Sequence, residues 1–270
     1  MAKFNLNEFQ KNKLLKFSND KSISNPLRFA LQDMVRGKID ADGKLLSTGK
    51  WKYGVVYRDV PLNEAVSNLK PKLVEFLIEL GADIHLRVKL ENSNDCTFLM
   101  VLADIRYYRT ETSEVAKILI KKGINVNAIE KKFGFSALSK AMISPTILKK
   151  LIKILLDNGA DVNIKTKEGY TSLMFGCQNP SDLESIKWVV EKGADLNVQN
   201  RFNETALYLI CKGSEKQHAK IEVIEYLLSK GADPTLGKDI LQHAGRKIKK
   251  FFKQKELTER SGLFGVKIKK

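Results

Sequence analysis

The sequence has few of the residues that staple small secreted proteins or bind metals. Only three cysteines occur, Cys96, Cys177 and Cys211, and their odd number and unpaired spacing favour a reducing compartment. The three histidines form no metal-like cluster with one another or with the cysteines. The chain also lacks a phosphate-cradling glycine loop and a Ser/His/Asp set in a plausible context. We therefore expect no catalytic residues, no cofactor and no metal site, and we expect that the protein is not an enzyme.

Long apolar runs are absent as well. No stretch approaches the roughly 18 apolar residues of a membrane-spanning helix, and residues 1–8 lack an apolar signal region. We expect an intracellular, cytoplasmic protein without a transmembrane segment, and a nuclear or host-cell location stays open. Hydrophobic residues make up 43% of the chain, which is enough for a packed core and argues against wholesale disorder.

Positive charge is concentrated at the two ends of the chain. The net charge of +16 divides into +7 for residues 1–58, +1 for 59–245 and +8 for 246–270. This division predicts an N-terminal basic helical region or cap (1–58), a nearly neutral central array (59–245) and a basic C-terminal helix or tail (246–270). Charge of this kind bears on partners and solubility rather than on fold.

The central region repeats one helix ending five times. An apolar triplet and two further residues, polar in all copies except for Leu80 in the first, precede a glycine, and in four copies Ala-Asp follows it. The glycines are Gly81, Gly123, Gly159, Gly193 and Gly231, at steps of 42, 36, 34 and 38 residues. A period in this range is typical of a solenoid, in which a unit buries its apolar face only by stacking on its neighbours.

A second signal recurs in phase with the glycines. Most of the in-phase leucines stand two residues after a Thr, Ser or Asp that can accept a hydrogen bond at a helix N-cap. These leucines are Leu62, Leu99, Leu138, Leu173, Leu207 and Leu241. Each unit is thus predicted to begin one helix at the capping residue, turn, and end a second helix at the glycine, where positive φ costs least. In the third unit this second helix carries one apolar face, formed by Leu148, Leu151, Ile152, Leu155 and Leu156.

Together these motifs resemble the ankyrin repeat. The best matches are Gly169-Tyr170-Thr171-Ser172-Leu173 with Gly159-Ala160-Asp161-Val162-Asn163, and Thr205-Ala206-Leu207 with Gly193-Ala194-Asp195-Leu196-Asn197. The resemblance covers about five repeats within residues 59–245. It implies an all-α fold, a solenoid of stacked helix pairs with projecting β-hairpin fingers, capped at both ends. It also implies a monomeric scaffold that binds another protein along the concave finger face.

Aromatic residues stand beside cations on three successive predicted fingers, at positions that contact partners in proteins of this family. The candidate partner-binding residues are Lys132, Phe133, Phe135, Lys167, Tyr170, Arg201 and Phe202. Aromatic and arginine side chains are common interface anchors because they bury a large area with few rotatable bonds. The alternative is that these aromatics cover neighbouring fingers and bind nothing. An acidic partner would suit the basic ends of the chain, which would speed its encounter.

The C-terminal region mixes cations with Ile248, Phe251 and Phe252. One interpretation is a helix that docks Ile248 and Phe251 on the last repeat and leaves its cations in water. The alternative function is a nucleic-acid-associated protein that grips phosphates through its basic flanks. The cations that would do so are Arg246, Lys247, Lys249, Lys250 and Lys253. A membrane-surface helix or a localisation signal is a third interpretation.

The N-terminal region is predicted from weaker signals. Residues 3–22 suggest a basic amphipathic helix or a mobile arm, and 26–36 suggest a helix in a degenerate capping unit. Residues 49–57 suggest a hairpin because strand-forming residues lie between glycines. Finger lengths vary: the first finger is extended through 88–94, and the last, after Gly231, is truncated as a terminal cap requires.

Overall fold

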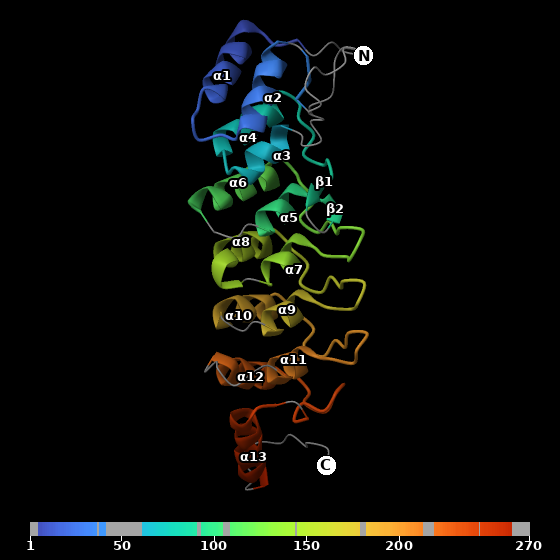
Figure 1. Cartoon of the computed structure of the whole chain (residues 1–270). Coiled ribbons are helices and arrows are strands. Elements are labelled where there is room, and N and C mark those ends of the chain that lie inside the picture. The colour runs from blue at the N-terminus through green and yellow to red at the C-terminus, as the bar shows by residue number, and fades with distance from the viewer. Residues whose placement is uncertain are drawn as a thin grey trace. The chain divides into compact units, whose positions relative to one another are not determined.

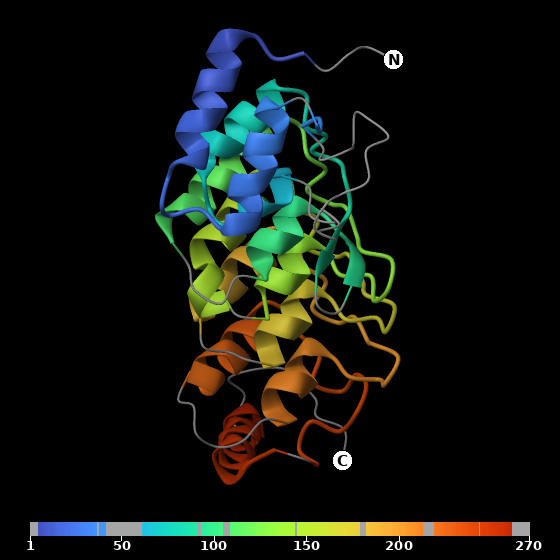
Figure 2. The same cartoon turned by 45° about the horizontal axis from the view of Figure 1, so that its top comes forward.

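The computed structural model describes residues 5–36, 38–41, 61–90, 93–104, 109–143, 145–178, 182–212, 219–242 and 244–260. The chain divides into two compact units, Met1–Asn125 and Val126–Lys270. Both are built from short antiparallel helices (Figure 1, Figure 2). The predicted hairpin at 49–57 and the end of the tail, 261–270, lie outside the described residues.

The described residues of the first unit form six helices and one pair of antiparallel strands. The helices are α1 (Glu8–Ser18), α2 (Asn25–Val35), α3 (Pro61–Ser67), α4 (Pro71–Glu79), α5 (Phe98–Ala103) and α6 (Thr110–Lys121). The extended first finger forms the antiparallel strands β1 (Val88–Leu90) and β2 (Ser93–Cys96), which confirms the extension predicted there. Helices α2, α3 and α5 pack in one layer and α4 packs on α6 in the other.

Over its described ranges, the second unit forms three helix pairs and a further helix. The pairs are α7 (Ala137–Ala141) with α8 (Pro145–Asp157), α9 (Ser172–Gln178) with α10 (Leu183–Glu191), and α11 (Ala206–Lys212) with α12 (Ala219–Ser229). Helices α7, α9 and α11 stack as one layer, and α8, α10 and α12 form the other. The final helix is α13 (Arg246–Arg260). This arrangement is the predicted all-α stack of helix pairs.

Local chemistry begins and ends these helices as the sequence predicts. The hydroxyl oxygens of Thr97, Ser136 and Thr205 accept hydrogen bonds from the backbone N–H three residues later, at 3.1 to 3.3 Å. The five repeat glycines all adopt positive φ between +81° and +96° at the ends of the second helices. The apolar face predicted for the third unit is buried on α8, from Leu148 to Leu156.

The three cysteines contribute to packing. Cys96, Cys177 and Cys211 are reduced thiols and all are buried. Burial raises the pKa of the Cys177 thiol, because the charged thiolate would lose its hydration there. Cys177 and Cys211 therefore act as small apolar side chains in α9 and α11, as their position in the repeat predicts.

Two predictions at the C-terminal end need correction. The helix predicted to begin after Asp239 does not form: a carboxylate oxygen of Asp239 accepts a hydrogen bond from the Leu241 N–H at 2.8 Å, and the segment is a turn. Over residues 246–254 of α13 the buried side chains are Ile248 and Phe252, whereas Phe251 is half-buried. The reason is helical geometry, since residues four apart share a face.

The two helices predicted near the N-terminus form, as α1 and α2, but they lie in the opposite layers to the two helices of a repeat. The four apolar residues predicted for the second helix, Leu27, Ala30, Leu31 and Met34, are buried in α2. In the repeats the first helix of each pair lies in the layer of α3 and α5, yet here it is the second helix, α2, that packs on α3. Helix α1 lies beside α4, where Phe17 contacts Phe76 with ring centroids 6.0 Å apart. The α1–α2 pair thus packs on α3 and α4 with its second helix, not its first, in the layer of α3.

A ladder of asparagine side chains joins successive repeats in the second unit. Asn163 donates from Nδ2 to the Gly193 carbonyl at 3.0 Å and accepts from the Asp195 N–H at 2.9 Å. Asn127 makes the same two bonds to the next repeat, and so does Asn197. The last residue of the Gly-Ala-Asp-x-Asn motif is thus an inter-repeat bridge in addition to a turn former.

We expect Asn163→Ala to lower the free energy of unfolding by about 1 to 2 kcal/mol, since both bonds to the next repeat are lost. Asn158→Ala is a matched control, because the Asn158 amide bonds only the Ile154 carbonyl of its own helix, at 2.8 Å. Urea unfolding followed by circular dichroism measures both variants. Equal losses would show that the ladder adds nothing to the coupling of the repeats.

Candidate functional site

Three fingertip loops of the second unit, 130–135, 166–170 and 200–204, are each closed by a side chain at their base. The buried carboxylate of Glu130 accepts the N–H groups of Lys132 and Phe133, each at 2.7 Å. Asn200 Oδ1 accepts from the N–H groups of Phe202 and Glu204 at 2.9 and 3.0 Å. Thr166 does the same for Tyr170 at 3.0 Å. These bonds hold each tip in one conformation.

Backbone hydrogen bonds also join each tip to the next. The Lys167 N–H donates to the Phe133 carbonyl at 2.8 Å, and the Arg201 N–H donates to the Glu168 carbonyl at 2.9 Å. This spacing requires close backbone approach: a Cβ on Gly169 would lie 3.0 Å from the Cα of Asn200. Gly169 has a φ of +84°, and Asn203 takes the equivalent left-handed position with φ +57°.

The predicted aromatic residues form one continuous row. The centroid of Phe133 lies 6.2 Å from that of Phe135, and Tyr170 lies 6.4 Å from Phe202. The ring that joins these pairs is Phe175 of α9, at 5.3 Å from Phe135 and 5.4 Å from Tyr170. We call these five rings the aromatic row. The inner rings of the row pack on one another, as the packing interpretation requires. The two end rings, Phe133 and Phe202, reach the surface, as the partner-binding interpretation requires.

Exposure separates the members of the row. Phe133 is 41% and Phe202 46% exposed, whereas Phe135 and Tyr170 are half-buried and Phe175 is buried. The ammonium of Lys132 lies 4.6 Å from the Phe133 ring centroid. The two other predicted cations, Lys167 and Arg201, are exposed at the neighbouring tips, and Arg201 pairs with Glu168 at 3.5 Å. The structure therefore brings all seven predicted partner-binding residues onto three adjoining tips.

Beside the row lies a polar network centred on Glu204, which is only 4% exposed. Its Oε2 accepts from Asn200 Nδ2 at 3.0 Å and from the Tyr170 hydroxyl at 3.2 Å. Its Oε1 accepts from Lys212 Nζ at 3.1 Å and lies 3.7 Å from Lys238 Nζ. One carboxylate thus joins α11, two fingertips and the last finger.

These contacts change the protonation chemistry of the network. Burial alone would raise the pKa of Glu204, but hydrogen bonds from Asn200 and Lys212 outweigh it and lower that pKa. Burial, followed by the nearby Glu204 carboxylate, raises the pKa of Tyr170 to about 12. The hydrogen bond to Glu204 raises the pKa of Lys212. At neutral pH the carboxylate and the ammonium are therefore charged and the phenol is neutral.

The network lines an open groove of about 610 Å³. Its walls come from the tips (Tyr170, Phe202, Glu204), from the ends of α9 and α11, and from Lys238. We call this groove, together with the three tips, the finger face. The sequence patterns did not indicate Phe175, Glu204 or Lys238 as part of this site. The one pattern that could have indicated Glu204 is its position directly after Phe202-Asn203 at a fingertip.

The cations proposed for nucleic acid lie on the outer side of α13. Arg246, Lys247, Lys249, Lys250 and Lys253 are all exposed, while Ile248 and Phe252 are buried. The helix therefore presents these five charges to solvent and buries Ile248 and Phe252.

Comparison with known proteins decides the family. The profile described as Ankyrin repeats (3 copies) matches residues 62–166, 99–200 and 173–253. The chain belongs to the ankyrin repeat family. Ankyrin repeats are in general protein–protein interaction modules, and the family is in general non-enzymatic.

Curated relatives carry the same repeats. A putative ankyrin repeat protein of Rickettsia bellii is 31% identical over 126 residues, which are 47% of this chain and 14% of the relative. Ankyrin repeat and SOCS box protein 6 of Pongo abelii, and that of Homo sapiens, are 32% identical over 120 residues, 43% of this chain and 26% of those proteins. The chain thus matches only a minor part of each relative's length.

The described part of the chain lacks a membrane-spanning helix and a metal-binding cluster. Among those residues, no helix is both long and apolar enough to cross a membrane. In the same ranges, no three His, Cys, Asp or Glu side chains come together in a way that could hold a metal ion.

Proposed function

We propose that this ankyrin repeat protein binds a partner protein through the finger face of its second unit. The observation that carries the proposal is the aromatic row, with two strongly exposed phenylalanines held on tips that hydrogen bonds fix in place. Rigid aromatic anchors beside a groove suit protein recognition, because their burial costs little conformational entropy.

Charge suggests the chemistry of that partner. The finger face holds six cations, Lys131, Lys132, Lys167, Arg201, Lys212 and Lys238, and three carboxylates, Glu130, Glu168 and Glu204, of which Glu204 lines the groove. An acidic segment would complement this surface, and the basic ends 1–58 and 246–270 would speed its approach. We infer that the face selects acidic protein segments with an apolar side chain that enters the groove.

We expect the double variant Phe133→Ala/Phe202→Ala to weaken partner binding at least tenfold, with a change in unfolding free energy of about 0.5 kcal/mol or less. The partner is first captured with the wild-type chain by affinity purification, identified by mass spectrometry, and then titrated by calorimetry. Phe29→Ala, which removes a ring that is 56% exposed in the first unit, is the matched control. A large loss of stability in the double variant would instead assign the two rings to packing.

Nucleic-acid binding by α13 is the second candidate function. The supporting observation is the difference in burial along the helix, in which Ile248 and Phe252 are buried while the five cations are exposed. Phosphate contacts of this kind weaken steeply as salt rises, because bound counterions are released. A gel-shift titration across salt concentration separates the candidates: absence of binding at low salt removes this one.

A further inference from the structure

A second groove lies on the first unit, along the side of α1 that faces α4. Its volume is about 710 Å³, and its walls include Phe9, Lys13, Lys16 and Phe17 from α1 and Lys72 from α4. The other α1 residues lie four, seven and eight positions after Phe9, so they share one side of that helix. Helix α1 contacts α4 through the rings of Phe17 and Phe76, and Phe17 is also part of the groove wall.

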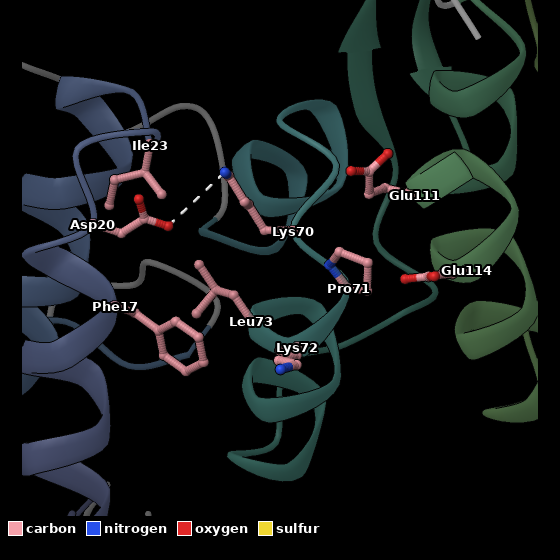
Figure 3. A pocket seen from close by; sticks show the side chains of 9 residues that line it. All are labelled: Phe17, Asp20, Ile23, Lys70, Pro71, Lys72, Leu73, Glu111 and Glu114. Carbon is pink, nitrogen blue, oxygen red and sulfur yellow. Dashed lines mark ion pairs between the residues drawn. The ribbon is translucent and has the colours of Figure 1, made fainter. Parts of the chain in front are cut away.

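The groove continues into a smaller cavity of about 230 Å³, drawn in Figure 3. Phe17, Ile23 and Leu73 face one another there and form an apolar floor between α1 and α4. The ion pair of Lys70 with Asp20, 3.9 Å apart, closes one side. Phe17, Asp20 and Lys72 line both spaces, so the two form one continuous surface.

The larger space, along α1, is lined by three lysines, Lys13, Lys16 and Lys72, and by one carboxylate, that of Asp20. In the described part of the first unit, no carboxylate pairs with Lys16 or Lys72, and Asp20 is taken by Lys70. The Lys13 ammonium lies 4.0 Å from the centroid of the Phe76 ring. A ligand that lies along α1 is therefore favoured when it brings negative charge to Lys16 and Lys72.

The same surface exposes an apolar side chain that a terminal cap would normally avoid. Phe9 is 71% exposed, although an end unit that faces water usually turns polar residues outward. An exposed ring at the mouth of a groove with an apolar floor suits a ligand that also has apolar groups. Purely polar polyanions would leave Phe9 and the floor of the cavity in water.

We propose that the α1–α4 groove is a second interaction surface and that it binds an acidic amphipathic segment of a partner protein. Apolar side chains of the segment lie on Phe9, Phe17 and Leu73, and its carboxylates face Lys16 and Lys72. The far end of the surface carries Glu111 and Glu114 of α6 (Figure 3), which repel an acidic residue and so set the register of the segment. The helix-in-groove mode of recognition has this geometry.

The test uses the full chain and a labelled synthetic peptide with leucines at helical positions i, i+3, i+4 and i+7 and glutamates elsewhere. Fluorescence anisotropy should detect binding, and a peptide with glutamines in place of the glutamates should bind at least tenfold more weakly. We expect Lys16→Gln/Lys72→Gln to weaken binding of the acidic peptide about tenfold, and Phe9→Ala to weaken it severalfold.

Matched controls keep the result specific. Lys117→Gln/Lys121→Gln removes two exposed charges from α6 that line neither space, and it should change affinity less than twofold. Phe133→Ala/Phe202→Ala, which disables the finger face, should bind the peptide like the wild type, so the two proposals fail separately. Equal losses in both lysine pairs, equal binding of the glutamine peptide, or no binding would overturn the proposal. Preference for anionic lipid vesicles over the acidic peptide would do so as well.

Discussion

Gly169→Ala is expected to lower the free energy of unfolding by about 3 kcal/mol. The left-handed φ of +84° contributes about 1 to 2 kcal/mol for any residue with a Cβ. The rest comes from steric contact, because the added Cβ would lie 3.0 Å from the Asn200 Cα and 3.3 Å from the Arg201 nitrogen. Both atoms belong to backbone, so the neighbouring tip itself must move. Chemical denaturation with two spectroscopic probes measures the loss.

Gly193→Ala isolates the steric part of this effect. Gly193 has nearly the same φ, +88°, but no atom lies within 4 Å of a Cβ built there. We expect a loss of about 1 to 2 kcal/mol at that position, from the backbone conformation alone. The Gly169 variant should also weaken partner binding, because displacement of the next tip breaks the aromatic row between Tyr170 and Phe202. Equal losses at the two glycines would mean that the tips are not tightly coupled.

Glu204→Gln is expected to lower the free energy of unfolding by about 2 kcal/mol at pH 7. Glutamine keeps the size of the side chain but loses the charge-assisted bond to Lys212, and its amide nitrogen meets the Asn200 and Tyr170 donors. The two lysines are half exposed and can be rehydrated, which keeps the loss below that of a fully buried pair. Tyr170→Phe, which keeps the ring contacts and removes one hydroxyl, should lose about 1 kcal/mol.

The effect of Glu204→Gln should depend on pH with a defined sign. The pKa of Glu204 is lower in the folded chain than in the unfolded chain, so the unfolded state binds more protons between the two values. The carboxylate therefore stabilises the fold fully above its unfolded pKa, and this contribution disappears as the pH falls through the folded pKa. Urea unfolding from pH 7 down to pH 3 should show the gap between wild type and variant narrowing. A constant gap would contradict the assignment.

Local signals were sufficient for most helices but failed where a helix depends on its surroundings. Thr97, Ser136 and Thr205 cap helices because their hydroxyls reach backbone N–H groups three residues away, an interaction that needs no other part of the chain. Asp239 has the same local chemistry, yet the segment after it remains a turn. With the preceding finger truncated, the residues that follow pack as a connection into α13.

Side-chain positions on the finger face could be predicted only in part. The recurrence of aromatics beside cations located all seven candidate residues on adjoining tips. It could not distinguish exposed Phe133 and Phe202 from half-buried Phe135 and Tyr170, because that depends on Phe175 of α9, which lies in a different element. Glu204 was not predicted for a related reason. A glutamate in a loop is expected to be exposed to solvent, and its burial depends on Tyr170 and Lys212, which lie in other elements.

The sequence by itself determined the repeat family, the helix boundaries set by caps and glycines, and the apolar faces, since each of these depends on residues within one or two turns. Only the tertiary structure decided which side chains meet across repeats: Tyr170 with Glu204, Phe17 with Phe76, and α2 rather than α1 on α3. The physical reason is the range of the interactions. Capping and helical periodicity act over a few residues, whereas packing and ion pairing join residues that only the stacking of separate helices brings together.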